Sequence, residues 1–166
     1  MSSGWGWVAV IGTQEVQRCH GPVVMNRRDP RWTGCQFHSN NAAEISALIS
    51  AAEWVASLDG RVGGQQFSSA VIIPDSWWAI RAAKGASPRF HRAAAGRAAQ
   101  AVRAGGIKLG WIKGHSGHVW NDVADFQANE GRVQAGGRRQ QPTVDRTVHL
   151  PACGPRPGAP PHAGVT

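Results

Sequence analysis

The sequence predicts an α/β fold in which helices flank a mixed β-sheet. In the second half of the chain, strand-like segments alternate with helical segments, as in a partly parallel sheet whose strands are joined by helical crossovers. The first half begins instead with two adjacent strand-like segments, which predict an antiparallel hairpin. A length of 166 residues, 42% of them hydrophobic, suffices for one domain with one core.

The predicted hairpin occupies residues 3–12 and 14–25. Its first arm, SGWGWVAVIG, is rich in Trp and Val, and a glycine ends it. Pro22 in the second arm indicates a bulge or a sheet edge, because proline cannot donate a hydrogen bond to a strand ladder. Residues 26–40 follow as a polar loop, in which an Asp-Pro pair signals a turn.

Residues 41–58 carry the clearest helical pattern. Apolar side chains recur there at helical spacing and would form one buried stripe, made of Ile45, Leu48, Ile49, Ala52 and Val55. The residues at its start, Ser39, Asn40 and Asn41, are all good N-cap types. Glu44 then falls in the first turn, where the helix dipole favours a negative charge.

After a glycine-rich loop at 59–69, short strands and helices alternate. The expected elements are a buried strand at 70–73 closed by Pro74 and Asp75, a helix at 76–83, an Ala-rich helix at 89–104 and a strand at 107–112. A loop with two histidines, GHSGH, and a helix carrying Asp122 and Asp125 come next. Strand, polar loop and helix in that order commonly present catalytic groups from a rigid scaffold.

The composition indicates which kind of partner the protein binds and in which cellular compartment it lies. The net charge of +8 and the pI near 11.0 favour a polyanionic partner such as nucleic acid, although a solvated basic surface would give the same balance. The chain has neither a signal-peptide pattern nor a run of ~18 apolar residues, so we expect an intracellular protein, nuclear or cytoplasmic, with no membrane partner. Three widely spread cysteines indicate reduced thiols. Residues 131–166 are rich in Gly, Pro and Arg, which predicts one domain at 1–130 and a disordered tail at 131–166.

Three acids have placements that solubility does not require. Each has a structural alternative: Glu44 could complement a helix dipole, Asp75 could be an N-cap, and Asp125 could be a solvated residue beside Asp122. Together, in a basic chain, they suggest a cluster of hard oxygen ligands for Mg²⁺. Two such ions ~4 Å apart would hold the attacking and leaving oxygens of a phosphodiester displacement.

Four segments occur in the order and at spacings that resemble one family. They are SGWGWVAVIG, HSNNAAEISALISAAEWV, VIIPDSWWAI and WIKGHSGHVWNDVADFQANEG. The last is the most specific, with Lys-Gly-His-x-Gly-His followed by Asn-x-x-Ala-Asp-x-x-Ala. From residue 3 to about residue 131 the chain resembles type 1 ribonuclease H, including the reverse transcriptase-associated domain of retroelements. The resemblance implies a ribonuclease H-like mixed sheet and hydrolysis of the RNA strand of RNA–DNA hybrids.

The same resemblance implies roles for individual residues. Glu44, Asp75 and Asp125 would be three of the four acids that hold two Mg²⁺ ions, with Mn²⁺ as a substitute. His115 would assist proton transfer and product departure, which suits an imidazole that titrates near neutral pH. The implied substrate-binding positions are Asn40, Asn41, Ser76, Lys113 and Asn121.

The sequence departs from the family at its beginning. The family's first catalytic aspartate lies on a central strand that would precede Met1, so we expect an N-terminally truncated domain, monomeric or part of a larger polyprotein. Two alternatives to an active hybrid-cleaving enzyme follow. One is a non-catalytic nucleic-acid-binding remnant of a retroelement domain, and the other is a nuclease of the same fold that acts on other nucleic acids.

For several other side chains, the sequence indicates a functional role less clearly. Basic residues between the helices could contact phosphates or simply keep the surface solvated; they are Lys84, Arg89, Arg92, Arg97 and Arg103. Trp77 and Trp78 could flank the substrate groove, but at least one of them is expected in the core. The Cys35-x-x-His38 spacing is poor for a zinc site.

Overall fold

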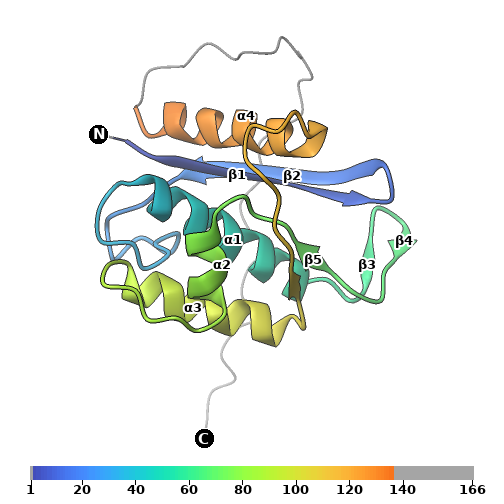
Figure 1. The fold of residues 1–166 in the computed structure, drawn as a ribbon, viewed down its shortest axis with the longest axis horizontal. Coiled ribbons are helices and arrows are strands. Elements are labelled where there is room, and N and C mark those ends of the chain that lie inside the picture. The colour runs from blue at the N-terminus through green and yellow to red at the C-terminus, as the bar shows by residue number, and fades with distance from the viewer. Residues whose placement is uncertain (1, 137–166) are drawn as a thin grey trace, which may run out of the picture.

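The computed structural model describes residues 2–136 and contains four helices and six short strands in that range (Figure 1). In chain order these are β1 Gly4–Ile11, β2 Gln14–Pro22, α1 Asn40–Ala56, β3 Arg61–Val62, β4 Gln65–Gln66, β5 Val71–Ile72, α2 Trp77–Ala83, α3 Arg92–Ala104, β6 Lys108–Leu109 and α4 Val119–Gln134. The mixture of helices and small sheets confirms the predicted fold class. Within residues 2–136, no helix is both long and apolar enough to cross a bilayer.

The N-terminal hairpin forms as predicted and lies between two helical layers. Figure 1 shows α4 along one face of β1 and β2, with α1, α2 and α3 on the opposite side. Ala9 pairs with Gln17 and Val10 with Glu15, so the register skips Val16 of β2, and the irregularity lies there rather than at Pro22, where β2 ends. On the α1 side, Trp7 donates from Nε1 to Ser50 Oγ at 3.0 Å, and its ring contacts Trp54.

The strands pair in separate small sheets rather than across one continuous sheet. Within residues 2–136 they form three two-stranded pieces: antiparallel β1–β2, antiparallel β3–β4 and parallel β5–β6. The small β3–β4 hairpin lies inside the predicted glycine-rich loop, where Gly63 and Gly64 both have positive φ and form the turn.

The expectation of a buried strand at residues 70–73 is wrong. Val71 is 52% exposed and Ile73 is 56% exposed. The physical reason is that β5 pairs with β6 on one edge, while its other edge has no strand partner among residues 2–136. Ile72, which points the other way, packs against the core.

The main core lies between α1, α2 and α3. Ile45 and Ile49 of α1 have no exposed surface, as the predicted stripe requires. They pack in one cluster with Ala94 and Ala98 of α3, whose small side chains allow the two helices to approach closely. Full burial of an isoleucine contributes roughly 1.5–3 kcal/mol, so this cluster is a principal source of stability.

The observed helix caps exclude the structural alternatives for Glu44 and Asp75, namely a charge in the first helical turn and an N-cap. Ser39 caps α1 by accepting a hydrogen bond from the Ala42 amide at 3.0 Å, and no acidic residue lies in the first turn. Glu44 is therefore one turn further along than predicted, where the dipole effect is weaker. Ser76, not Asp75, caps α2 through the Ala79 amide.

Two other boundaries differ from the prediction. Helix α3 begins at Arg92 rather than Arg89, because His91 adopts a left-handed backbone conformation with φ 58. Helix α4 continues to Gln134, four residues beyond the predicted end of the domain, and its Gly131 packs directly against the backbone of Gly21. The predicted disordered tail lies outside the described residues from 137 onwards.

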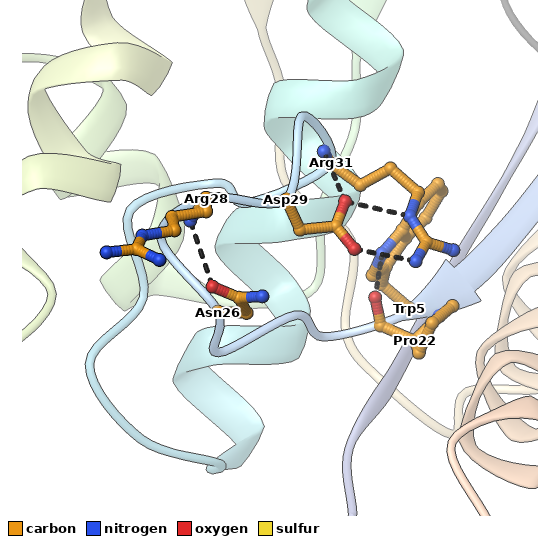
Figure 2. A network of polar contacts seen from close by, with 6 residues as sticks. All are labelled: Trp5, Pro22, Asn26, Arg28, Asp29 and Arg31. Carbon is orange, nitrogen blue, oxygen red and sulfur yellow. Dashed lines mark hydrogen bonds and ion pairs between the residues drawn. The ribbon is translucent and has the colours of Figure 1, made fainter.

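The polar loop after β2 is held by local hydrogen bonds (Figure 2). Asn26 Oδ1 accepts from the Arg28 amide at 3.0 Å, and Trp5 Nε1 donates to the Pro22 carbonyl at 3.0 Å. Arg31 binds Asp29 through both its amide and its guanidinium, which lowers the pKa of Asp29 to about 2. Asp29 is thus committed to this turn and is not a member of the acid cluster.

Candidate functional site

The three acids singled out in the sequence come from three separate elements and line one groove. Glu44 projects from the second turn of α1, and Asp75 follows β5 after Pro74. Asp125 lies in α4. All three belong to the walls of a groove of about 540 Å³ that is bounded by β1, β5, α1 and α4.

The carboxylates in this groove influence each other electrostatically. Burial, together with the negative charges of Asp75 and Asp125, raises the pKa of Glu44 to about 7. The pKa of Asp125 is also raised, chiefly by burial and then by the charge of Asp75, while His115 acts in the opposite direction. Among residues 2–136, none of the three forms an ion pair with lysine or arginine. Within the described residues, the groove thus gathers carboxyl groups that neither lysine nor arginine neutralises.

The donor set fits a divalent cation, although the side chains are not yet gathered around one point. Carboxylate oxygens are the ligands that Mg²⁺ prefers, and a bound cation would reverse the upward pKa shifts of Glu44 and Asp125. Within the described residues, however, no three His, Cys, Asp or Glu side chains are close enough to form a ready-made metal site. Repulsion between like charges opposes such a gathering when no cation is bound.

The histidine loop lies beside this acid cluster. His115 has a left-handed backbone with φ 53, and its Nδ1 lies 3.7 Å from Asp125 Oδ2. The His115 side chain is 91% exposed, so it can reach solvent and a bound substrate alike. Gly114 is in close contact with Asp75, because a Cβ at Gly114 would lie 2.7 Å from Asp75 Oδ2. The sequence patterns did not predict this close contact between Gly114 and Asp75. The position of Gly114 between Lys113 and His115 was the one feature that could have indicated it.

A family model described as RNase H matches residues 9–133, which is about three-quarters of the chain. The chain belongs to the RNase H family. The matched range contains all three acids and His115. A search among curated proteins found no match.

The other predicted substrate-binding residues of the RNase H domain lie in different settings. Asn40 and Asn41 are exposed at the start of α1, one turn before Glu44 and on the same side of the helix. Lys113 is exposed in the histidine loop. Ser76 Oγ is already used as a helix cap, whereas Asn121 lines the groove and has a buried Nδ2 without a hydrogen-bond partner in residues 2–136.

Two exposed tryptophans stack beside Asp75. The rings of Trp77 and Trp111 are 5.2 Å apart and nearly parallel, and Trp111 Nε1 donates to the Asp75 carbonyl at 3.1 Å. Trp78 instead packs against the core, which confirms that one of the two neighbouring tryptophans is structural. The sequence predicts only that Trp111 lies at the end of a strand. The structure adds that it lies beside Asp75, one of the three acids of the RNase H domain.

The basic residues divide into two groups. Arg97 binds the Glu53 carboxylate and the Trp32 carbonyl, so it holds α3 against α1 and the preceding loop. Arg92 is exposed and follows His91, which hydrogen-bonds Ser39 at the start of α1. The guanidinium of Arg97 is therefore engaged within the fold, whereas Arg92 is exposed. Cys35 is buried, with its Sγ near Thr33 and Ser46, and burial raises the pKa of this thiol.

Proposed function

We propose that the chain is a metal-dependent endonuclease that hydrolyses the RNA strand of RNA–DNA hybrids. Membership of the RNase H family supports the reaction class. The observation that carries the proposal for this chain is that Glu44, Asp75 and Asp125 line one groove, where burial and neighbouring charge raise the pKa of Glu44 and of Asp125 beside an exposed histidine. Perturbed carboxyl groups of this kind, in a cleft, are typical of functional sites.

Each residue has a distinct part in the proposed reaction. Glu44, Asp75 and Asp125 would hold Mg²⁺, which in such sites lowers the pKa of an attacking water and stabilises the charge on the scissile phosphate. His115 would give a proton to the departing 3′ oxygen of the RNA strand. The carboxylate of Asp125 lies 3.7 Å from His115 Nδ1, so it would orient the imidazole beside the groove for this transfer.

Substrate binding would use the exposed side chains around the acids. Asn40 and Asn41 would donate to the sugar edges of the hybrid, where the 2′-hydroxyl distinguishes RNA from DNA. The stacked indoles of Trp77 and Trp111 offer an aromatic face on which a sugar or a base can pack. Arg92 and Lys113 would contact phosphates.

The test is cleavage of a hybrid with a 5′-labelled RNA strand in Mg²⁺, with RNA duplex and DNA duplex as substrate controls. Asp75→Asn and Glu44→Gln should each lose activity by about 100-fold or more, since each removes a charge from the cluster. Asp59→Asn serves as the matched variant, because Asp59 is an exposed acid outside the groove. Equal cleavage by wild type and Asp75→Asn would contradict the proposal.

A second function is favoured by one observation. The described residues contain no ready-made group of metal ligands. A nucleic-acid-binding domain without catalysis would have this property. Hybrid binding with no Mg²⁺- or Mn²⁺-dependent cleavage would support this alternative, while cleavage by the wild-type chain would exclude it.

A further inference from the structure

Two exposed phenylalanines form a ring pair outside the groove that holds the acids. Phe37, in the loop before α1, is 42% exposed, and Phe90, in the loop before α3, is 48% exposed. Their rings meet edge to face with centroids 5.4 Å apart, and neither residue lines the groove. Single exposed apolar residues are ordinary on a protein surface, but two aromatic rings brought together from distant segments form a patch of a kind that binds partners.

A buried histidine holds the two loops of this ring pair together. His91 is 1% exposed, and its amide donates to Gln36 Oε1 at 2.8 Å. Its Nδ1 accepts from the Gln36 amide at 3.2 Å, and its Nε2 lies 3.1 Å from Ser39 Oγ. The imidazole also contacts the ring of Phe37, with centroids 4.4 Å apart. The rings are therefore fixed before any partner arrives, which lowers the entropy cost of binding.

The charged side chains on these loops are all positive. Residues 35–41 and 84–92, which contain the two rings, have no Asp or Glu. Lys84, Arg89 and Arg92 lie in the second segment and are exposed. The guanidinium of Arg89 lies over the ring of Phe90, 5.2 Å from its centroid. A ligand that matches both features is an anion with flat, apolar faces.

The ring pair lies next to the end of α1 that leads to the acid cluster. Phe37 is three residues before Asn40, and Glu44 is four residues after Asn40 in the same helix. Four helical residues span about 6 Å. A nucleic acid strand that leaves the acid cluster over the start of α1 therefore continues towards Phe37.

Other occupants match this surface less well. A second copy of the chain would bring the Arg89 and Arg92 side chains of both copies together, and such like charges repel. An apolar peptide would leave the same cations without a partner. An intact double helix keeps the faces of its bases stacked inside, so it cannot use the rings. Unpaired nucleotides offer both phosphates and open base faces.

We propose that Phe37 and Phe90 form a stacking surface for unpaired nucleobases, and that Arg89 and Arg92 hold the adjoining phosphates. The surface binds a single-stranded stretch that continues from a hybrid, and it does so without a metal ion. The inference rests on the proposed function only in taking nucleic acid as the substrate. It does not require that the chain cleaves anything.

The probe is a fluorescein-labelled oligothymidylate of about ten nucleotides, within the range that single-strand sites cover. It is compared with an oligonucleotide of the same length and charge in which abasic sugars replace the nucleosides. Binding to the full chain is measured by fluorescence anisotropy in EDTA. The wild type should bind oligothymidylate about tenfold or more tighter than the abasic strand, because stacking requires bases.

Replacing the rings should abolish this preference for bases. In a double variant, Phe37→Leu with Phe90→Leu, the two oligonucleotides should bind within about twofold of each other, because leucine keeps apolar surface but has no aromatic face. Both positions are partly exposed, so the variant should fold. Phe90→Trp keeps an aromatic face and should keep the preference. Val10→Ala is the matched control, since Val10 is an exposed apolar residue on β1.

The arginines should act on both oligonucleotides alike. Arg92→Ala should weaken binding of each by a similar factor, because a phosphate contact does not depend on the base. Arg61→Ala is the matched control, because Arg61 is exposed in β3, outside the two loops. Its affinity for each strand should equal that of the wild type.

Three results would overturn the proposal: no measurable binding of oligothymidylate, equal binding of the two oligonucleotides by the wild type, or an undiminished preference in the double leucine variant. The second of these would assign the ring pair to a partner other than nucleic acid bases. Because the assay contains neither metal nor hybrid, its failure leaves the nuclease proposal untouched, and a chain that cleaves nothing can still show the preference.

Discussion

Ile49 in α1 is completely buried, whereas Ile73, just beyond β5, is 56% exposed. The first belongs to the helical core, by which we mean the cluster between α1, α2 and α3. The second belongs to the groove between β1 and β5, where apolar walls, an orphaned amide and three acids lie together. Within residues 2–136, the buried polar side chains of the helical core have hydrogen-bond partners, whereas Asn121 Nδ2 in the groove has none. Stability is therefore concentrated in one region, and the acid cluster lies in the other.

Truncating one isoleucine in each region tests this division most strongly. Ile49→Ala should lower the free energy of unfolding by about 2–5 kcal/mol, because it leaves a cavity in packed surroundings. Ile73→Ala should change it by less than about 0.5 kcal/mol, because the side chain is mostly in water already. Urea denaturation of both variants measures the difference. Similar losses in the two variants would mean that the groove is packed as tightly as the core.

The acid cluster should make the groove region sensitive to pH. The Glu44 carboxyl has an ordinary pKa of 4.5 and a folded pKa of about 7. Below pH 4.5 it is protonated in both states, and between pH 4.5 and 7 the unfolded chain loses its proton first. Stability should therefore fall as the pH rises through this window, by up to about 3 kcal/mol.

Glu44→Gln should remove this decline and be more stable than the wild type at pH 8. The measurement is urea denaturation at pH 5 and pH 8 for both proteins. Mg²⁺ at pH 8 should stabilise the wild type more than the variant, because only the wild type has the full set of carboxylates. An identical pH dependence in the two proteins would show that Glu44 is not in an acidic environment.

A third comparison concerns the contact that holds α4 on the hairpin. A Cβ at Gly131 would lie 2.3 Å from the Gly21 carbonyl oxygen, so Gly131→Ala should cost about 1–3 kcal/mol. Gly96→Ala in α3 has open space around the new methyl group and should instead stabilise the chain by up to about 1 kcal/mol. Thermal unfolding of both variants shows directly whether each substitution raises or lowers the stability. A stabilising Gly131→Ala would mean that α4 can move away from the hairpin at little cost.

The smallest expected effects separate two arginines on α3. Arg92→Ala should reduce the slope of hybrid affinity against salt by about one, because it removes one phosphate contact. Arg97→Ala should leave the slope unchanged and cost less than about 1 kcal/mol of stability, since its partner Glu53 is a partly exposed carboxylate. Filter binding over a range of salt concentrations distinguishes them. A lowered slope for Arg97→Ala alone would reverse the assignment.

The sequence predicted the helical core, and it singled out three acids that line one groove in the structure, because both follow from local patterns. The stripe through Ile45 and Ile49 repeats at helical spacing, and Asp75 and His115 stand in motifs that resemble ribonuclease H. The exposure of Val71 was not predictable in this way. Its apolar neighbours read as a buried strand, but burial depends on which strand lies alongside, and that is a long-range property.

Two smaller differences from the sequence prediction also arise from long-range contacts. The positive φ of His91 shortens α3, and that backbone conformation is held by contacts with Gln36 and Ser39, more than fifty residues earlier in the chain. The close contact of Gly114 with Asp75 joins two loops that only the folded sheet brings together. Local propensity contains no information on either contact.

Asp75 and Asp125 belong to two halves of the molecule that no backbone hydrogen bond in residues 2–136 joins directly. The spacing between these carboxylates is set by the packing of α4 on the hairpin and of β1 and β5 on α1, which deforms more easily than a strand ladder. Relative motion of the two halves would vary that spacing. If the carboxylates hold a cation, as proposed, its apparent affinity is reduced by the fraction of time that they spend too far apart. Stiffening this spacing would strengthen cation binding without altering any ligand.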